Sequence, residues 1–512
     1  MNRIIYATLA PVLGNILGSN LSGQPSLASP TLNPILEIGI VQRFGEKPQD
    51  QITLRALPGD RLYLKFGKTS LTAEQITLSL SRTPLASPET VEKLILSNHR
   101  SFENAAASAF RLKEKGVATE IAQPRRWQVW AQRDRFATPL SQHLLLLGLQ
   151  GKGYVQVQPR THLTQVTWQV AGNRYQGDRL GISSGRGVIQ VNNRPYGGSL
   201  RVQPNAHDSF TLVNLVPLET YLRGVVPHEI GYQAPFAAVQ AQAVLARTYA
   251  LASRHRFKVD QYELCATTQC QVYRGLEQTT TTADQAITST KAQVLTYQER
   301  VIDALYSSNT GGVTANYNDL WDGEPRPYLQ SVFDTVNNPL PPQQRDLSQA
   351  ENLRTFLQLR QGFNEQQWRT FRWQKSSTLA EITQGLQEFL RLSGDRATKL
   401  KQVKSLTVKQ RAKSGRVLQL EVETDAGMLT IEKDEIIDAF LAPNSTFFEL
   451  QPILGADATL QGYSFSGGGL GHGVGMSQTG SYYLAGLGWD FARILRFYYS
   501  GVKLQKLRPG MW

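Results

Sequence analysis

Residues 458–489 contain no aspartate, glutamate, lysine or arginine, and this uncharged stretch constrains the fold more than any other part of the chain. Seven glycines occur in the run from Ser464 through Gly480. Glycine lets the backbone approach another strand or a ligand closely. The spacing is not G-x-G-x-x-G and no lysine follows it, which disfavours nucleotide binding. The sequence therefore predicts a close backbone contact here, followed by helices over 480–487 and 491–499.

The length of 512 residues predicts two or three domains. Hydrophobic residues make up 41% and charged residues 19% of the chain, which is typical of globular proteins. A net charge of +13 favours polyanionic partners such as nucleic acid, anionic lipid or an anionic wall polymer. There is no dense block of lysine and arginine and no nucleic-acid-binding motif, so we expect no nucleic-acid partner.

The N-terminus has the pattern of an export signal. Arg3 precedes a mostly apolar stretch over 4–17, no acidic residue occurs before Glu37, and small residues stand at Ser26 and Ala28. We expect residues 1–28 to be a secretory signal that directs the protein to the periplasm or cell wall. An uncleaved membrane anchor is the alternative.

The fold class is expected to be α+β, with a separate N-terminal α/β region over 36–160. Strand-like alternation over 36–82 is followed by a helix, two strands, a second helix and a strand, at 102–115, 118–121, 127–131, 139–149 and 154–157. This order resembles the small glycan-binding SPOR module, a wall-associated domain. An ordinary α/β packing domain is the alternative.

The rest of the chain, 161–512, is expected to be a β-rich core whose helices flank a cleft. Short strand signals separated by turns over 165–202 predict an antiparallel meander. A subdomain with fewer motifs is expected at about 340–450.

A carboxylate between two helices is the first candidate for catalysis. Residues 218–229 begin as an amphipathic helix, and Pro227 is expected to end it, which places His228 and Glu229 in a connection. An alanine-rich helix then follows over 236–252. Glu229 is a candidate acid/base, and helix dipole and burial act oppositely on its pKa. A capping or salt-bridging role is the alternative. Position 232 is tyrosine, which excludes an H-E-x-x-H zinc motif.

Two further segments carry polar chemistry. Cys265 and Cys270 are the two cysteines, and they could supply half of a zinc site, form a small-loop disulfide, or remain free thiols. The segment 304–314 runs from a strand into hydroxyl, amide and glycine residues. Such a loop suits a hydroxyl-rich ligand, and a simple turn is the alternative.

Four blocks in order resemble the family of stage II sporulation protein D and the amidase enhancer LytB. They are residues 218–229 with the helix after them, the Cys-x-x-x-x-Cys-Gln-Val-Tyr-x-Gly string at 265–275, the Gly311-Gly312 loop, and 471–478. The resemblance implies a lytic transglycosylase that cleaves peptide-stripped glycan strands of peptidoglycan, with Glu229 as catalytic acid/base. The alternative that it implies is a noncatalytic wall-binding protein or an activator of a wall amidase. A polyanion-binding protein that uses net charge alone is a third hypothesis.

The same resemblance supplies the other site residues. Arg247 is a candidate either for substrate binding or for a structural anchor. The remaining candidates for binding sugar are Ser308, Gly311, Gly312, Gly471, His472, Gly473, Ser477 and Gln478. The sequence departs from the family pattern at Gln269 and Ser307, where the family often has histidine. No cofactor is required, and a structural zinc at Cys265 and Cys270 stands beside the disulfide as an alternative. Expected partners are glycan strands and a wall amidase, and the oligomeric state does not follow from the sequence.

Overall fold

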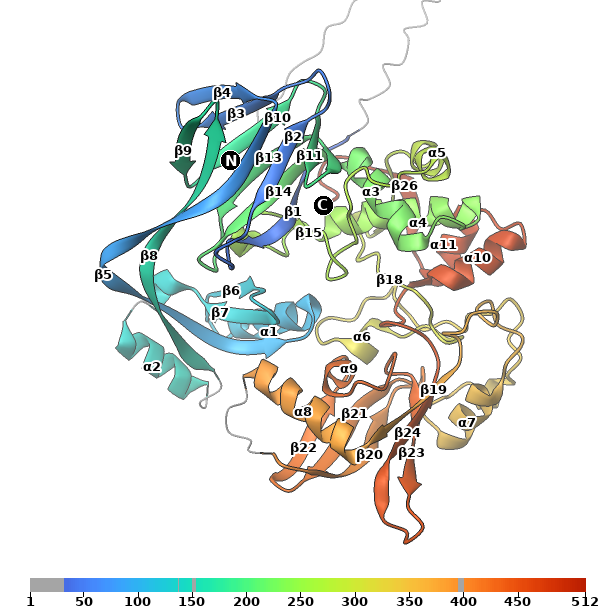
Figure 1. The fold of residues 1–512 in the computed structure, drawn as a ribbon. Coiled ribbons are helices and arrows are strands. Elements are labelled where there is room, and N and C mark those ends of the chain that lie inside the picture. The colour runs from blue at the N-terminus through green and yellow to red at the C-terminus, as the bar shows by residue number, and fades with distance from the viewer. Residues whose placement is uncertain (1–31, 137, 150–152, 395–399) are drawn as a thin grey trace, which may run out of the picture.

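The computed structural model describes residues 32–136, 138–149, 153–394 and 400–512, and it is a mixed α+β protein rich in strands, which confirms the fold class (Figure 1). The expected signal segment, residues 1–28, lies outside the described residues. Within those ranges, none of the helices combines the length and apolar character needed to span a membrane.

A first sheet of seven strands has the order β15-β1-β14-β13-β10-β3-β4. Its neighbours are antiparallel except for the parallel pair of β1 and β15. Side chains alternate across it, so that Leu62 and Leu64 are buried while Tyr63 and Lys65 face solvent. The strands are β1 Ile35–Phe44, β3 Leu62–Phe66, β4 Thr69–Ala73, β10 Leu180–Ser184, β13 Ser199–Pro204, β14 Phe210–Pro217 and β15 Leu264–Cys265.

A second sheet of eight strands has the order β12-β11-β2-β5-β7-β6, with β8 beside β5 and β9 beside β8. The long antiparallel strands β5 and β8 run together from the first sheet's region toward α1 and α2 (Figure 1). The strands are β2 Ile52–Ala56, β5 Gln75–His99, β6 Thr119–Ala122, β7 Trp127–Ala131, β8 Tyr154–Val170, β9 Asn173–Gly177, β11 Val188–Val191 and β12 Arg194–Gly197.

The N-terminal strands are therefore interleaved with later ones. β1 pairs with β14, β3 pairs with β10, and β2 pairs with β11. The strands expected to form one meander divide between the two sheets: β10 and β13 pair in the first, whereas β8 and β11 lie in the second, where β2 and β5 separate them. The domain boundary expected near residue 160 does not coincide with a boundary between sheets, since strands from both sides of it share one core.

A smaller module projects from these sheets. It comprises residues 84–160 and is called the α/β module. It holds the ends of β5 and β8, the helices α1 Phe102–Glu114 and α2 Pro139–Gly148, and β6 and β7. Its order of helix, strand, strand, helix and strand is the one expected. Ser101 caps α1, accepting a hydrogen bond from the backbone of Asn104 at 3.4 Å.

A group of helices packs against the first sheet. Its centre is α4, which is buried along most of its length and lies against α3, α5 and α11. A three-stranded sheet of β17, β16 and β26 also packs near α4. The elements are α3 Leu218–Ile230, α4 Phe236–Ala252, α5 Thr281–Ser289, α10 Gln478–Gly486, α11 Phe491–Tyr498, β16 Gln293–Tyr297, β17 Arg300–Val301 and β26 Lys503–Lys506.

Residues 373–467 contribute most of a second, separate core that lies below the helices in Figure 1. Two three-stranded antiparallel sheets, β20-β21-β22 and β19-β24-β23, pack with α8 and α9 around it. The elements are α7 Ala350–Gln358, α8 Leu379–Ser393, α9 Glu435–Ala439, β19 Trp373–Thr378, β20 Val403–Arg411, β21 Val417–Thr424, β22 Gly427–Glu432, β23 Phe448–Leu454 and β24 Leu460–Gly467. Short elements connect the two cores: α6 Tyr317–Leu320, β18 Tyr306–Ser307 and β25 Met476–Ser477.

Candidate active site

Glu229 lies in the last turn of α3, and Pro227 lies inside the same helix. The prediction that Pro227 places His228 and Glu229 in a connection is therefore wrong. A proline inside a helix costs about 3 kcal/mol. The apolar face of α3 is buried in the main core, and this packing holds the last turn in place. The helix ends at Gly231, whose φ of 87° favours glycine.

The Glu229 carboxyl group is surrounded by hydrogen-bond donors. Its Oε1 accepts a bond from the backbone N–H of Val272 at 2.6 Å, and the side chains of Tyr306 and Gln478 lie close to the carboxyl group. Burial raises the pKa of Glu229 to about 7, and these three polar neighbours oppose part of that rise. Near neutral pH such a group exists in both forms, so it can donate a proton and take one back.

A chain of hydrogen bonds orients Tyr306 toward Glu229. The Tyr221 hydroxyl donates to Oε1 of Gln271 at 3.3 Å, and Nε2 of Gln271 donates to the Tyr306 hydroxyl at 2.9 Å. Because the Tyr306 oxygen accepts that bond, its own proton is available for the Glu229 carboxylate. This series of hydrogen bonds therefore fixes which group is the donor in each of them.

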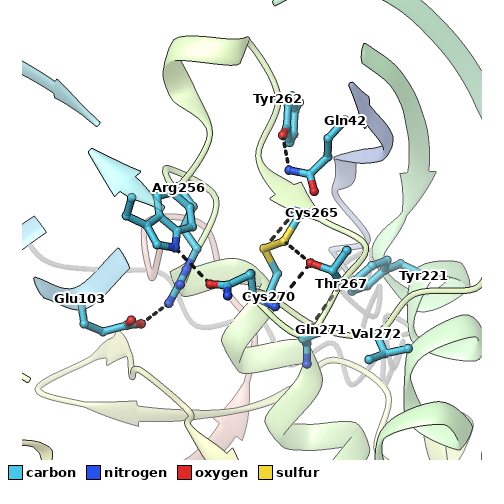
Figure 2. Close-up of a disulfide and its surroundings, with 12 residues drawn as sticks. Gln42, Glu103, Tyr221, Arg256, Tyr262, Cys265, Thr267, Cys270, Gln271 and Val272 are labelled. Carbon is cyan, nitrogen blue, oxygen red and sulfur yellow. Dashed lines mark hydrogen bonds and ion pairs between the residues drawn. A yellow bond between two sulfur atoms is a disulfide. The ribbon is translucent and has the colours of Figure 1, made fainter. Parts of the chain in front are cut away.

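Cys265 and Cys270 are joined by a disulfide (Figure 2). Cys265 is held in β15 beside β1, and Gln271 and Val272 directly follow Cys270. The disulfide therefore anchors the chain immediately before Gln271 and Val272, which contact Tyr306 and Glu229.

This disulfide contradicts the zinc alternative, because both sulfurs are bonded to each other. Gln269, where the family often has histidine, accepts a hydrogen bond from the Trp127 indole N–H at 3.1 Å. Across the described ranges, there is no group of three or more histidine, cysteine, aspartate or glutamate side chains that could hold a metal ion. The residues present do not fit a zinc site.

A cavity of about 390 Å³ lies against Glu229, and three parts of the chain line it. Polar and aromatic groups dominate the lining, as in pockets that orient a ligand through a few placed contacts. The lining residues used below are Arg100 and Glu103 of the α/β module, Glu229, Arg256 and Tyr306 near α3 and α4, and Trp321, Asp434 and His472.

His472 and Gly471, predicted to bind sugar, line this cavity. Burial lowers the pKa of His472 to about 4, so the imidazole is neutral at neutral pH. Its Nδ1 accepts a bond from the backbone N–H of Val474 at 3.0 Å, and the Trp321 ring lies 5.2 Å away. Gln478 lies beside Glu229 and donates to its backbone carbonyl at 3.0 Å. These three candidates are therefore brought to Glu229 or to its cavity.

Three other candidates surround a buried carboxylate instead of a ligand. Glu365 is fully buried. It accepts bonds from the backbone N–H groups of Thr310 and Gly312, both at 2.6 Å, and from the Ser477 hydroxyl. A Cβ added to Gly311 would lie 2.6 Å from the backbone of Gly468. Gly311, Gly312 and Ser477, which were predicted to bind substrate, are packed inside the protein and do not line this cavity.

The last three candidates also lie outside the cavity. Arg247 is fully buried, and its Nη2 is 2.7 Å from Oε2 of Glu219, so the structural-anchor alternative holds for it. A Cβ on Gly473 would lie 2.2 Å from the guanidinium of Arg416, which leaves no space for a sugar there. Ser308 is partly exposed, but it is not among the residues that line the cavity.

Sequence reasoning missed several cavity residues. Tyr306 directly precedes the Ser-rich loop, and its position was a usable signal. Asp434 is buried, and burial raises its pKa to about 7, whereas its Oδ1 and Oδ2 accept bonds from Asn104 at 2.9 Å and Trp321 at 3.1 Å. Arg100 and Glu103 carry no local signal, because only the tertiary fold brings the α/β module to Glu229.

Comparison with known proteins places two matched regions around this cavity. Residues 206–297 match the family model described as stage II sporulation protein, and residues 315–475 match a domain of unknown function, DUF8618. The first region holds Glu229 and the disulfide, and the second holds Trp321, Asp434 and His472. The α/β module lies outside both.

Curated relatives agree with this assignment. The chain is 29% identical to the amidase enhancer of Bacillus subtilis over 64% of its own length, and the match covers 49% of that protein. It is 26% identical to stage II sporulation protein D of Bacillus subtilis, over 57% of this chain and 76% of that one. An uncharacterised protein of Brachyspira hyodysenteriae is 27% identical over 63% of this chain and 77% of that one.

The helix that carries Glu229, the disulfide loop beside it and these matches define a protein with a stage II sporulation protein domain. The matched family model and these relatives support the assignment of the chain to the SpoIID/LytB family.

Proposed function

We propose that the protein acts in the cell wall and cleaves glycan strands of peptidoglycan as a lytic transglycosylase, with Glu229 as the acid/base. One observation carries this proposal: the carboxyl group of Glu229, whose pKa is raised to about 7, faces the cavity and lies among oriented donors. A group tuned in this way is suited to donate a proton at neutral pH.

The two other carboxyl groups of the cavity named above are held by the protein itself. Asp434 accepts bonds from Asn104 and Trp321, and Glu103 is paired with Arg256 at 2.5 Å. An ordinary glycosidase needs a second carboxylate as nucleophile or as base for a water. Because groups of the protein already bind Asp434 and Glu103, a mechanism that needs a single carboxyl group is favoured.

The reaction proceeds as follows in this proposal. Glu229 donates its proton to the glycosidic oxygen, and the bond from C1 of muramic acid to that oxygen breaks. The C6 hydroxyl of the same sugar attacks C1, and its proton returns to the Glu229 carboxylate. The products are a strand with a new 4-hydroxyl end and a 1,6-anhydro-muramyl end, and no water is consumed. Tyr306 and Val272 stabilise the carboxylate between the two transfers.

Product analysis tests this function. Peptide-stripped glycan strands are incubated with the protein, and the fragments are analysed by mass spectrometry. Anhydro ends, one water lighter than hydrolysed ends, are expected. Release of only hydrolysed ends would replace the transglycosylase with a hydrolase, and strand binding without release would favour the second candidate below.

The pH dependence gives a prediction for Tyr306. Cleavage by the wild type should fall as the pH rises through about 7, because Glu229 loses the proton that it donates. The Tyr306 hydroxyl lowers the pKa of Glu229, so Tyr306→Phe should move this fall to higher pH. Initial rates of fragment release across neutral pH measure the shift. Tyr63→Phe, at an exposed position on β3, is the matched control. An unchanged profile in Tyr306→Phe would contradict the role given to the hydroxyl.

A noncatalytic role is the second candidate, because one relative carries the name amidase enhancer. In that role the protein binds strands and activates a wall amidase as its partner, after export to the periplasm or cell wall. Equal stimulation of an amidase by the wild type and Glu229→Gln, with no cleavage by either, would favour this candidate.

A further inference from the structure

The α/β module, which neither family model covers, forms one wall of the cavity. Arg100, Ser101 and Glu103 reach the cavity from the turn between β5 and the start of α1. The module is fixed there by contacts to the second core. Arg126 lies 2.7 Å from Asp438, and the backbone N–H of Arg100 donates to Glu435 at 3.0 Å.

Among the described residues at this wall, Arg100 is the arginine whose side chain stays partly accessible. Arg256 is almost fully buried and is paired with Glu103 (Figure 2). Arg126 is paired with Glu435 and Asp438. Nε of Arg100 lies 3.4 Å from Oδ1 of Asp438, which also pairs with Arg126. Nη1 of Arg100 donates to the backbone carbonyl of Asp434 at 3.2 Å. The Arg100 side chain is 34% exposed.

Donor groups of two arginines lie at this wall. Nε of Arg256 is buried and has no hydrogen-bond partner among the described residues. Arg100 lines the cavity and its side chain is 34% exposed, so part of its guanidinium is open to a ligand. A guanidinium presents paired N–H donors that match the two oxygens of a carboxylate. The wall is therefore suited to an anionic group on a ligand that also reaches Glu229.

We propose that Arg100 forms an anion subsite that recognises a sugar carboxylate, with the Arg256–Glu103 pair as its floor. This inference rests on the proposed function and names the part of the substrate that is recognised. In a stripped strand, the lactyl group of muramic acid ends in a free carboxylate. In a strand that carries peptide, the same carbon is an uncharged amide, which cannot accept the paired donors as an anion does.

The experiment measures binding in the Glu229→Gln background, so that cleavage does not interfere. The two probes are a tetrasaccharide of alternating N-acetylglucosamine and N-acetylmuramic acid with free lactyl groups, and a tetrasaccharide of N-acetylglucosamine alone. Adding Arg100→Gln should weaken binding of the first probe by about tenfold or more and leave the second unchanged. Arg100→Lys, which keeps the charge but loses the paired geometry, should lie between.

Arg111→Gln is the matched control, since Arg111 lies on α1 of the same module, is 54% exposed and pairs with Asp322 away from the cavity. Equal weakening of both probes by Arg100→Gln, or an equal effect of Arg111→Gln, would overturn the subsite. If the wild type releases anhydro ends while Arg100→Gln keeps full selectivity, the subsite fails and the proposed function stands. If neither probe binds and the wild type releases no fragment, both fail.

Discussion

Replacing Glu229 with glutamine should reduce the release of anhydro-muramyl fragments by about 10²–10⁴-fold, which is the usual contribution of a general acid/base. Glutamine keeps the size of the side chain and an acceptor for Val272, but it has no proton to donate to the glycosidic oxygen. Initial rates on peptide-stripped strands measure the effect. Glu299→Gln, the same change at an exposed surface pair, should leave the rate unchanged. A rate within threefold of wild type, on the order of 1 kcal/mol or less, would remove Glu229 from the mechanism.

The same variant reports the pKa of Glu229 without any substrate. Folding raises this pKa from the ordinary value of 4.5 to about 7. Between these values the native state binds more protons than the unfolded state, so wild-type stability falls as the pH rises through this window. The stability of Glu229→Gln does not fall in this way, because glutamine does not titrate. Its stability relative to wild type should therefore rise by about 2–3 kcal/mol between about pH 5 and about pH 8, as measured by urea unfolding. A constant difference would mean that the pKa is not raised.

The largest effect on stability is expected at Glu365. This fully buried carboxylate accepts bonds from Thr310, Gly312 and Ser477, and it lies against Asp334, whose pKa is raised well above its ordinary value by burial and by the charge of Glu365. Glu365→Gln would turn an amide NH₂ toward these N–H donors. We expect a loss of about 3–5 kcal/mol, which is typical when one member of a buried charged network is removed.

Urea unfolding at neutral pH measures this loss. Glu351→Gln, at an exposed position on α7, is the matched control and should change stability by less than about 0.5 kcal/mol. A loss below about 1 kcal/mol in Glu365→Gln would show that the network around the Gly311-Gly312 loop contributes little to the fold. Glycan binding should persist in whatever fraction remains folded, since Glu365 does not line the cavity.

Local patterns predicted most of the secondary structure. The strands β2 and β3 occupy the expected residues, and α4 begins and ends where the alanine-rich segment does. Such segments have strong period-two or helical patterns, and short-range preferences determine them. The prediction that the helix ends at Pro227 was wrong, because burial of the surrounding helix outweighs the local preference of proline.

The candidate site was predicted less completely. Glu229, Gly471, His472 and Gln478 come together as the motif order suggested. Several glycines of the uncharged stretch approach the protein's own backbone: a Cβ on Gly475 would lie 1.9 Å from the carbonyl oxygen of Leu305. A sequence shows that the backbone must come close to something, but it does not say to what.

By itself the sequence indicated the resemblance to the SpoIID/LytB family, the α+β class and Glu229 as the candidate acid/base, because these follow from short motifs and local periodicity. The tertiary structure alone decided how acidic that carboxylate is and what surrounds it. The pKa of Glu229 depends on burial and on donors from Val272, Tyr306 and Gln478, which are distant in sequence. The wall that Arg100 and Glu103 provide comes from strands β5 and β8, which carry the α/β module to the cavity through long-range pairing that no local pattern encodes.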